Sequence, residues 1–186
     1  MKRSIDMLVA LVAGVALLAP AALIAAAVRL TSDGPALHWS RRVGRHGVLF
    51  SMPKFRTMRI DAPQLPTDRM SDPRAYLTPI GSFLRRSSLD EIPQLWSVLT
   101  GEMSLVGPRP ALFNQEALIR RRRELGIDRL RPGITGWAQV NGRDEATEER
   151  KVELDSEYLR HAGFIMDLRI LGLTVWRVLG SHGVAH

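Results

Sequence analysis

Two adjacent carboxylates, Asp90 and Glu91, follow a pair of arginines in the stretch RRSSLDEIPQL. Acidic residues are favoured at a helix N-terminus, and Ser88 to Glu91 fits the Ser-x-x-Glu capping box. A helix capped at Ser88 would however place Pro93 at its fifth position, where the missing N–H costs an intrahelical hydrogen bond. A helix that begins nearer the proline leaves both acids at its mouth, beside the arginines. The residues alone leave both interpretations open: acids that only start a helix, or acids that act on an anion that the arginines hold.

Other basic residues stand in patterns that suit an anionic group. Arg109 lies between two prolines in the tetrapeptide GPRP, which predicts a stiff backbone and a guanidinium that loses little entropy on binding phosphate. The same tetrapeptide also fits a plain turn. Lys54 and Arg56 alternate in the stretch KFRTM, so they share one face of a predicted strand and fit either an anion site or solvated charges. The run Arg120–Arg123 predicts a helix surface that faces solvent or lipid headgroups rather than a catalytic feature.

Composition limits the classes of function. The 186 residues carry a formal charge of +7 with a sequence pI near 10.9, so an anionic partner is expected: nucleic acid, an anionic membrane surface or a phosphorylated substrate. The chain has no cysteine, which excludes disulfides, thiolate metal sites and a cysteine nucleophile. It contains no Walker loop, G-x-G-x-x-G or G-x-S-x-G motif, and its histidines show no metal-ligand spacing.

An apolar segment from Met7 to Val28 predicts membrane association. It contains no charged side chain and, as a straight helix, would be roughly 33 Å long, enough for a bilayer core. Pro20 interrupts the segment, and basic residues flank both of its ends, whereas positive flanks prefer the cytoplasmic side. A helix that breaks at Pro20 and returns keeps both flanks on one side. A re-entrant helix and a spanning helix both remain open, while the length of the apolar run disfavours a cleaved signal peptide.

The remaining chain predicts an α+β fold that is mostly helical. Gly44 and Gly47 separate two short stretches with strand character at 37–60, which predicts a β-hairpin, and the prolines at 61–82 predict mostly loop. The stretch RPGITGWAQVNGR at 131–143 is glycine-rich and is predicted to be irregular. Helices are predicted at 92–99, 112–125, 145–161 and 164–179. The first and last of them carry aliphatic and Trp residues that fit interfacial amphipathic helices in the headgroup plane and a soluble core equally well.

Three motifs resemble the bacterial sugar transferase family: KFRTM at 54–58, SLDEIPQLWSVLTGEMSLVGPRP at 88–110 and RPGITGWAQVNGR at 131–143. They occur in the family's order, and the resemblance runs from the apolar segment to the last predicted helix. Members are monotopic polyprenyl-phosphate phosphoglycosyl transferases. The resemblance implies transfer of a sugar-1-phosphate from a UDP-sugar to undecaprenyl phosphate, with Mg²⁺ and release of UMP. It also implies a minimal catalytic form: a re-entrant membrane helix at 1–30 and a membrane-associated catalytic domain at 31–186, facing the cytoplasm at the bacterial inner membrane.

The resemblance implies roles for particular residues as well. Asp90 is expected to be the nucleophile, and Glu91 a metal ligand or a metal-orienting residue. The family's Ser-Pro pair in the membrane helix is Ala19-Pro20 here, so the kinking proline is kept and the serine's hydrogen bond is lost. The stretch 38–40 departs from the family pattern, so the family's substrate contacts there are not carried over to this chain. A role in binding phosphate, nucleotide or substrate is expected for the other matching positions, which are Lys54, Arg85, Arg109, Arg143 and Asp155.

A non-enzymatic function competes with this interpretation. The basic total and the arginine run also fit a membrane-tethered protein that binds nucleic acid or anionic lipid without catalysis. The paired acids inside the basic region, and a sequence without any nucleic-acid-binding module, speak against it. The expected partners are therefore a UDP-sugar, undecaprenyl phosphate and the lipid bilayer, with no nucleic acid.

Overall fold

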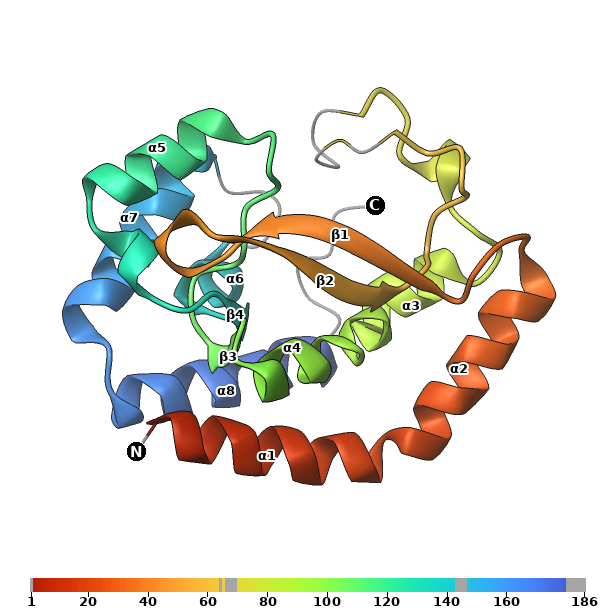
Figure 1. Ribbon diagram of the computed structural model, residues 1–186, viewed down its shortest axis with the longest axis horizontal. Helices are drawn as coiled ribbons and strands as arrows, with labels where there is room; N and C mark the ends of the chain where they lie inside the picture. Colours follow the sequence, from red (N-terminus) through yellow and green to blue (C-terminus); the bar gives the residue numbers. More distant parts are fainter. Residues whose placement is uncertain (1, 64, 66–69, 143–146, 180–186) are drawn as a thin grey trace.

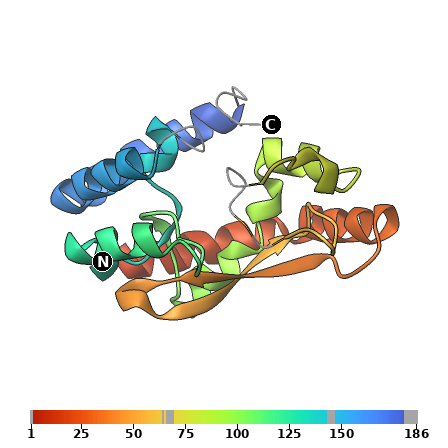
Figure 2. The same cartoon turned by 90° about the horizontal axis from the view of Figure 1, so that it is seen from above.

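The computed structural model describes residues 2–63, 65, 70–142 and 147–179. Its hairpin lies on one side of the molecule and its last two helices on the other, with the first helix between them (Figure 2). The predicted class, α+β and mostly helical with a short hairpin, is confirmed. In chain order the elements are α1 (Lys2–Ala16), α2 (Leu18–Thr31), β1 (Leu37–Val43), η1 (Arg45–Gly47), β2 (Leu49–Phe55), η3 (Arg74–Tyr76), α3 (Gly81–Ser87), η4 (Leu89–Glu91), α4 (Gln94–Thr100), β3 (Ser104–Val106), α5 (Glu116–Glu124), η5 (Ile127–Arg129), β4 (Gly133–Thr135), α6 (Trp137–Asn141), α7 (Glu148–His161) and α8 (Phe164–Leu179).

The apolar N-terminal segment forms two helices that meet at an angle of 61°. Leu17 separates them, and Pro20 lies in the first turn of α2. A continuous helix would need a hydrogen bond from the nitrogen of Pro20 to the carbonyl of Ala16, and the proline ring would clash there. Among the described residues no single helix is long and apolar enough to cross a membrane, whereas α1 and α2 together are. The predicted break is confirmed and lies three residues before the proline.

The first helix, α1, runs beside α4 (Figure 1), and its polar side chains attach it to the rest of the molecule. Asp6 is buried and accepts hydrogen bonds from the hydroxyl of Ser104 at 2.7 Å and from the N–H of Leu105 at 3.4 Å. Arg3 donates to the carbonyls of Val98 and Leu99 at 2.5 and 3.0 Å, at the end of α4 where the helix dipole is negative. The N-terminal part of α1 is therefore bound to α4 and β3.

The predicted hairpin is formed by β1 and β2, which pair antiparallel over seven residues each. His46 and Gly47 both adopt left-handed conformations in the connection, with φ of 57° and 77°. The register places His38 opposite Lys54. Arg56, directly after β2, is buried and donates to the backbone carbonyls of Ser32 and Pro35, so it ties the end of α2 to the hairpin.

A parallel pair of three-residue strands, β3 and β4, joins the two halves of the chain and is absent from the sequence-based prediction. The backbone just after β3 and the backbone just before β4 lie so close that a Cβ on Gly107 would stand 2.3 Å from the carbonyl oxygen of Arg131. Val106 of β3 enters the main core, which α6, α7 and α8 complete with Trp137, Tyr158 and Ile170. The prediction of irregular structure at 131–143 is therefore wrong for β4 and α6.

Three predicted helices also differ from the structure at their boundaries, and the helix expected at 92–99 is α4, Gln94–Thr100. The helix expected to begin at Leu112 begins at Glu116, because the side chain of Gln115 accepts the N–H of Leu112 and the segment forms a turn first. The helix expected from residue 145 is described from Glu148, with Thr147 as its N-cap. Residues 143–146 lie outside the described residues.

Replacing Gly107 with alanine tests the close approach of the two segments after β3 and before β4. The new Cβ would meet backbone atoms that cannot rotate away, so the free energy of unfolding is expected to fall by roughly 2 kcal/mol or more. Gly172→Ala in α8 is the control, since a Cβ there meets no described atom within 4 Å. This substitution is expected to raise the free energy of unfolding by up to about 1 kcal/mol, because alanine favours a helix more than glycine does. Thermal unfolding in detergent measures both, and an unchanged Gly107→Ala midpoint would contradict the packing argument.

Candidate active site

Asp90 and Glu91 lie in the tight connection between α3 and α4. The chain reverses at Ser88, which adopts a left-handed conformation with φ of 56°. The side chain of Ser88 makes no capping bond to any described residue, and Glu91 pairs with Arg109 instead, so the capping-box interpretation is wrong. Pro93 precedes the first residue of α4, where its missing N–H costs no helical bond. Both acids therefore stand at the mouth of α4, as the alternative interpretation predicted.

Glu91 is held in an ion pair across the site. The Arg109 guanidinium, on the loop after β3, donates from Nη2 to Oε1 of Glu91 at 2.7 Å. Burial by itself raises the pKa of Glu91, but the charge and hydrogen bond of Arg109, together with the charges of Lys54 and Arg42, hold that pKa below its ordinary value. The Arg109 side chain is 44% exposed, so an incoming anion can reach it while Glu91 stays ionised.

Asp90 as a residue is buried, at 7% exposure, whereas Glu91 is of intermediate exposure. Burial and the neighbouring charge of Glu91 raise the pKa of Asp90 to about 6. The positive charges of Lys54, Arg109 and Arg85 oppose that rise. Asp90 is therefore mostly ionised at neutral pH, without a general base, in a site with little water around it.

The cations around Asp90 repel one another. Burial and the charge of Arg42 lower the pKa of Lys54 to about 8. Burial and the charge of Arg109 likewise lower the pKa of Arg42 to about 10, and burial and the charge of Lys54 lower the pKa of His38. Such crowding costs free energy that a bound anion would relieve, and clusters of this kind are typical of functional sites.

The structure brings together three of the predicted phosphate-binding residues from three separate elements. Lys54 comes from β2, Arg85 from α3 and Arg109 from the loop after β3, and the charge of each one acts on Asp90. Arg85 is oriented by a hydrogen bond from Nε to the hydroxyl of Thr57 at 3.1 Å. Their contacts with a substrate stay a prediction, and Arg143 lies outside the described residues.

Asp155, on α7, lies 1% exposed and bound to an arginine that the sequence analysis assigned to a surface. Arg122 of α5 donates to Oδ2 of Asp155 from Nη2 at 2.6 Å and from Nε at 3.0 Å. Burial raises the pKa of Asp155, and the charge of Arg122 opposes that rise. A substrate contact of Asp155 stays a prediction. The expectation that the whole arginine run faces solvent or lipid is wrong for Arg122, whose side chain is 11% exposed.

Helical and strand periodicity contained the signals for the two arginines that sequence reasoning missed. Arg122 follows the buried Leu118 by four residues, so both lie on one face of α5. Arg42 follows the buried Ser40 by two residues on β1 and donates to the Ser40 hydroxyl at 3.0 Å. Each arginine side chain therefore lies on the same face of its element as a buried residue, although arginine as a residue type is usually exposed.

The acidic pair fits a Mg²⁺ ion that is shared between the protein and the substrate phosphates. Mg²⁺ is usually held by one or two carboxylates together with substrate phosphates, rather than by a cage made only of protein. Among the described residues no group of three or more His, Asp or Glu side chains is placed to hold a metal ion. Glu91 would supply a carboxylate oxygen, and the substrate phosphates and water would have to supply the remaining ligands.

The chain matches the bacterial sugar transferase family over residues 1–181, so it belongs to that family. It is 43% identical over 159 residues to the uncharacterized sugar transferase EpsL of Bacillus subtilis, with 86% of this chain and 77% of EpsL covered. It is 42% identical to the UDP-glucose:undecaprenyl-phosphate glucose-1-phosphate transferase of Xanthomonas campestris and 40% identical to the undecaprenyl-phosphate glucose phosphotransferase of Komagataeibacter xylinus. The alignments cover 85% and 97% of this chain but only 34% and 36% of those two longer relatives.

The low pKa of Lys54 leads to a pH dependence of anion binding. Below about pH 8 the Lys54 amine is charged, and above it the charge is lost, so affinity for pyrophosphate is expected to fall as pH rises through about 8. Lys54→Arg keeps its charge and should retain roughly tenfold higher affinity than the parent at pH 9.5. Lys151→Arg on α7 is the matched control. Calorimetric titration measures the pyrophosphate affinity of all three proteins at each pH. The protonation of pyrophosphate itself affects all three proteins equally. If the affinities of the parent and Lys54→Arg change with pH in the same way, Lys54 does not contribute its charge to the site.

Proposed function

We propose that this chain transfers a sugar-1-phosphate from a UDP-sugar to undecaprenyl phosphate, which yields a polyprenyl-diphosphate sugar and UMP. One observation carries the proposal: an ionised, nearly buried carboxylate, Asp90, surrounded by the mutually repelling cations Lys54, Arg85 and Arg109. The names of the two longer relatives, which specify this transfer for glucose, support the same reaction class. The reaction begins the assembly of a lipid-linked glycan.

The proposed first step is nucleophilic attack of an Asp90 oxygen on the β-phosphorus of the UDP-sugar. The bond from that phosphorus to the bridging oxygen breaks, and UMP leaves with the bridging oxygen and its electron pair. A phosphosugar-aspartyl enzyme remains. In the second step a phosphate oxygen of undecaprenyl phosphate attacks the same phosphorus, and the Asp90 carboxylate departs unchanged. No proton transfer is needed, because both nucleophiles are anions.

Electrostatics decide whether such a reaction can run, since an anion must approach a diphosphate. Lys54, Arg85 and Arg109 offset the charge of the substrate and of the transition state, and preorganised donors of this kind are usually the largest catalytic contribution. The raised pKa of Asp90 increases its basicity while leaving it mostly ionised near pH 7. Mg²⁺ held by Glu91 and the substrate phosphates would supply further charge neutralisation at the phosphate oxygens.

A re-entrant position of α1 and α2 in the inner membrane accounts for the way both ends of the helix pair are bound. Lys2, at the start of α1, forms an ion pair with Asp167 of α8 at 2.5 Å. At the other end, Val28 of α2 packs against Phe55 and Leu84 in a buried cluster. A single straight span would carry these two ends to opposite sides of a bilayer. Attachment of both ends to one folded body supports the re-entrant alternative, with the catalytic domain on the cytoplasmic side.

Exposed apolar side chains on several elements support the proposed membrane contact. They cover the outer faces of α1, α2 and α8 and extend to α3 and α4, far more than scattered exposure produces. The most exposed members on these elements are Leu8, Leu11, Val12, Val15, Leu18, Leu23, Leu30, Phe83, Trp96, Phe164, Ile165, Leu168, Val175 and Trp176. The undecaprenyl carrier would reach the site from this surface, whereas the nucleotide sugar comes from water.

Asp90→Asn tests the reaction and its intermediate. The substitution keeps the side-chain volume, so the thermal midpoint should stay close to the parent while turnover falls by about three orders of magnitude or more. UMP release from a panel of UDP-sugars, with undecaprenyl phosphate and Mg²⁺, measures turnover. Glu102→Gln, an exposed acid on the connection after α4, is the control and should react like the parent.

The covalent route makes a separate, visible prediction. Without lipid acceptor, the parent protein and a sugar-labelled UDP-sugar should give one labelled adduct per active chain, and Asp90→Asn should give none. Intact-protein mass spectrometry detects it. Failure to trap an adduct, together with a rate law that requires both substrates bound at once, would favour direct displacement. If no UDP-sugar yields UMP, the competing hypothesis of a membrane-tethered protein without catalysis would be favoured.

A further inference from the structure

The loop that carries Arg109 is held by its carbonyl groups. Four consecutive carbonyl oxygens, from residues 108 to 111, each accept a hydrogen bond, and the donors come from three elements: β4, α5 and β1. Two donors are backbone N–H groups: Gly133 to the oxygen of Pro108 at 3.0 Å, and Val43 to the oxygen of Ala111 at 2.9 Å. The two oxygens between them accept bonds from arginine side chains. The prolines on both sides of Arg109 have no N–H, so the carbonyl groups are the main backbone groups through which hydrogen bonds fix the loop.

Arg122 supplies the bond nearest to the active site. Its Nη1 donates to the carbonyl oxygen of Arg109 itself at 2.8 Å, and Arg42 Nη1 donates to the next carbonyl, that of Pro110, at 3.1 Å. Nε and Nη2 of Arg122 both donate to Asp155. One planar guanidinium therefore links α7 to the backbone of Arg109 from its position on α5.

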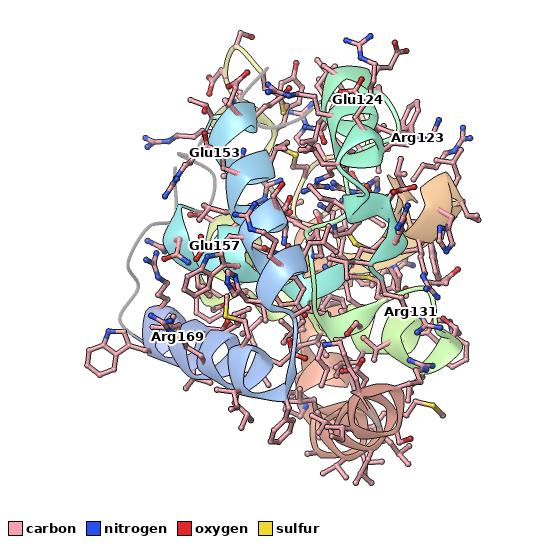
Figure 3. The ribbon with its side chains drawn as sticks, turned by 90° about the vertical axis from the view of Figure 1, so that its left-hand side faces the viewer. Arg123, Glu124, Arg131, Glu153, Glu157 and Arg169 are labelled. Carbon is pink, nitrogen blue, oxygen red and sulfur yellow. The ribbon has the colours of Figure 1, made fainter. Side chains whose placement is uncertain are left out.

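The position of this pair excludes a surface role. The side chains of Arg122 and Asp155 are 11% and 1% exposed, between two helices that run side by side (Figure 3). Glu153, on the same α7 helix, is 65% exposed and pairs with its own helix neighbour Arg150. A planar guanidinium whose three nitrogens all donate hydrogen bonds sets direction as well as charge, which a lysine ammonium cannot do in the same way.

We infer that Arg122, oriented by Asp155, is a positioning residue that fixes Arg109 against Glu91 and the substrate phosphate. The inference rests on the proposed phosphate-binding role of Arg109. The Arg122 guanidinium donates to Asp155 and to the backbone carbonyl of Arg109. The side chain of the same Arg109 donates to Glu91, so Arg122 acts on the site through the backbone of Arg109. Asp155 acts one step further back. The competing interpretation is that the pair only joins α5 to α7 and serves stability.

Arg122→Lys separates the two interpretations. A lysine keeps the charge beside Asp155, but its single nitrogen cannot also hold the Arg109 carbonyl in the same geometry. The thermal midpoint should therefore stay close to the parent, while kcat/KM for the UDP-sugar falls about tenfold or more. Arg121→Lys on the same helix is the control, since Arg121 is 54% exposed and outside the site, and should behave like the parent.

The same substitution in an Arg109→Ala background gives the decisive comparison. If Arg122 acts through the Arg109 side chain, Arg122→Lys should change kcat/KM by less than about twofold there. An equal loss in both backgrounds would overturn the inference and leave only a structural link between α5 and α7. Parent-like kcat/KM in the single variant would overturn it as well.

Pyrophosphate affinity provides a readout that does not depend on catalysis. Arg122→Lys and Asp155→Asn should each weaken binding when Arg109 is present and leave it unchanged in the Arg109→Ala background. If the parent releases no UMP from any UDP-sugar, the proposed reaction fails while this binding pattern still supports the positioning role. If turnover is normal but the binding pattern is absent, the positioning role fails alone.

Discussion

Placing two adjacent carboxylates in a nearly buried site is the constraint on which the rest of the molecule depends. Neighbouring negative charges and burial both favour protonation, and the raised pKa of Asp90 shows that cost. The fold offsets it with fixed cations rather than with water, because Arg109 binds Glu91 and the charges of Lys54 and Arg85 act on Asp90. Those cations repel one another in turn, so the unliganded site has an unmet preference for a further anion. A diphosphate bound at this site would relieve that repulsion, so the way the acids are stabilised supports the proposed substrate class.

The cations are useful only if the backbone delivers them from different parts of the chain. Lys54 arrives on a hairpin strand, whereas Arg109 arrives on a loop that leaves the parallel strand β3. That loop owes its course to glycines, since any Cβ at Gly107 or Gly133 would collide with the backbone opposite. The buried arginines then fix the carbonyl groups of the loop. Backbone packing and side-chain bonds thus share the task of orienting one guanidinium.

Sequence reasoning located the centre of the site but not its supports. Asp90, Glu91, Lys54 and Arg109 stand in motifs whose order along the chain is itself informative, and the hairpin follows from alternation and two glycines. Strands of three residues, such as β4, are too short for a periodic signal and form only because their backbones can approach closely. Arg122 was assigned to a surface because four successive arginines suggest solvent. The partner that makes its burial favourable, Asp155, lies 33 positions away and only the fold brings it near.

Ala19 stands before Pro20 where the family resemblance implies a serine, and the place of the bend shows what this residue contributes. The helices separate at Leu17, and the carbonyl of Leu17 accepts the N–H of Ala21, so α2 starts with its own regular bonding. A continuous helix is prevented by the backbone N–H that Pro20 lacks and by its ring, and neither of them involves residue 19. A serine hydroxyl could add a bond to the bend, but the angle does not require it. The bend is further held from outside, since Lys2 and Arg3 fasten one helix and Val28 packs the other onto the same body. Proline and tertiary contacts together are therefore sufficient for the bent geometry in this chain.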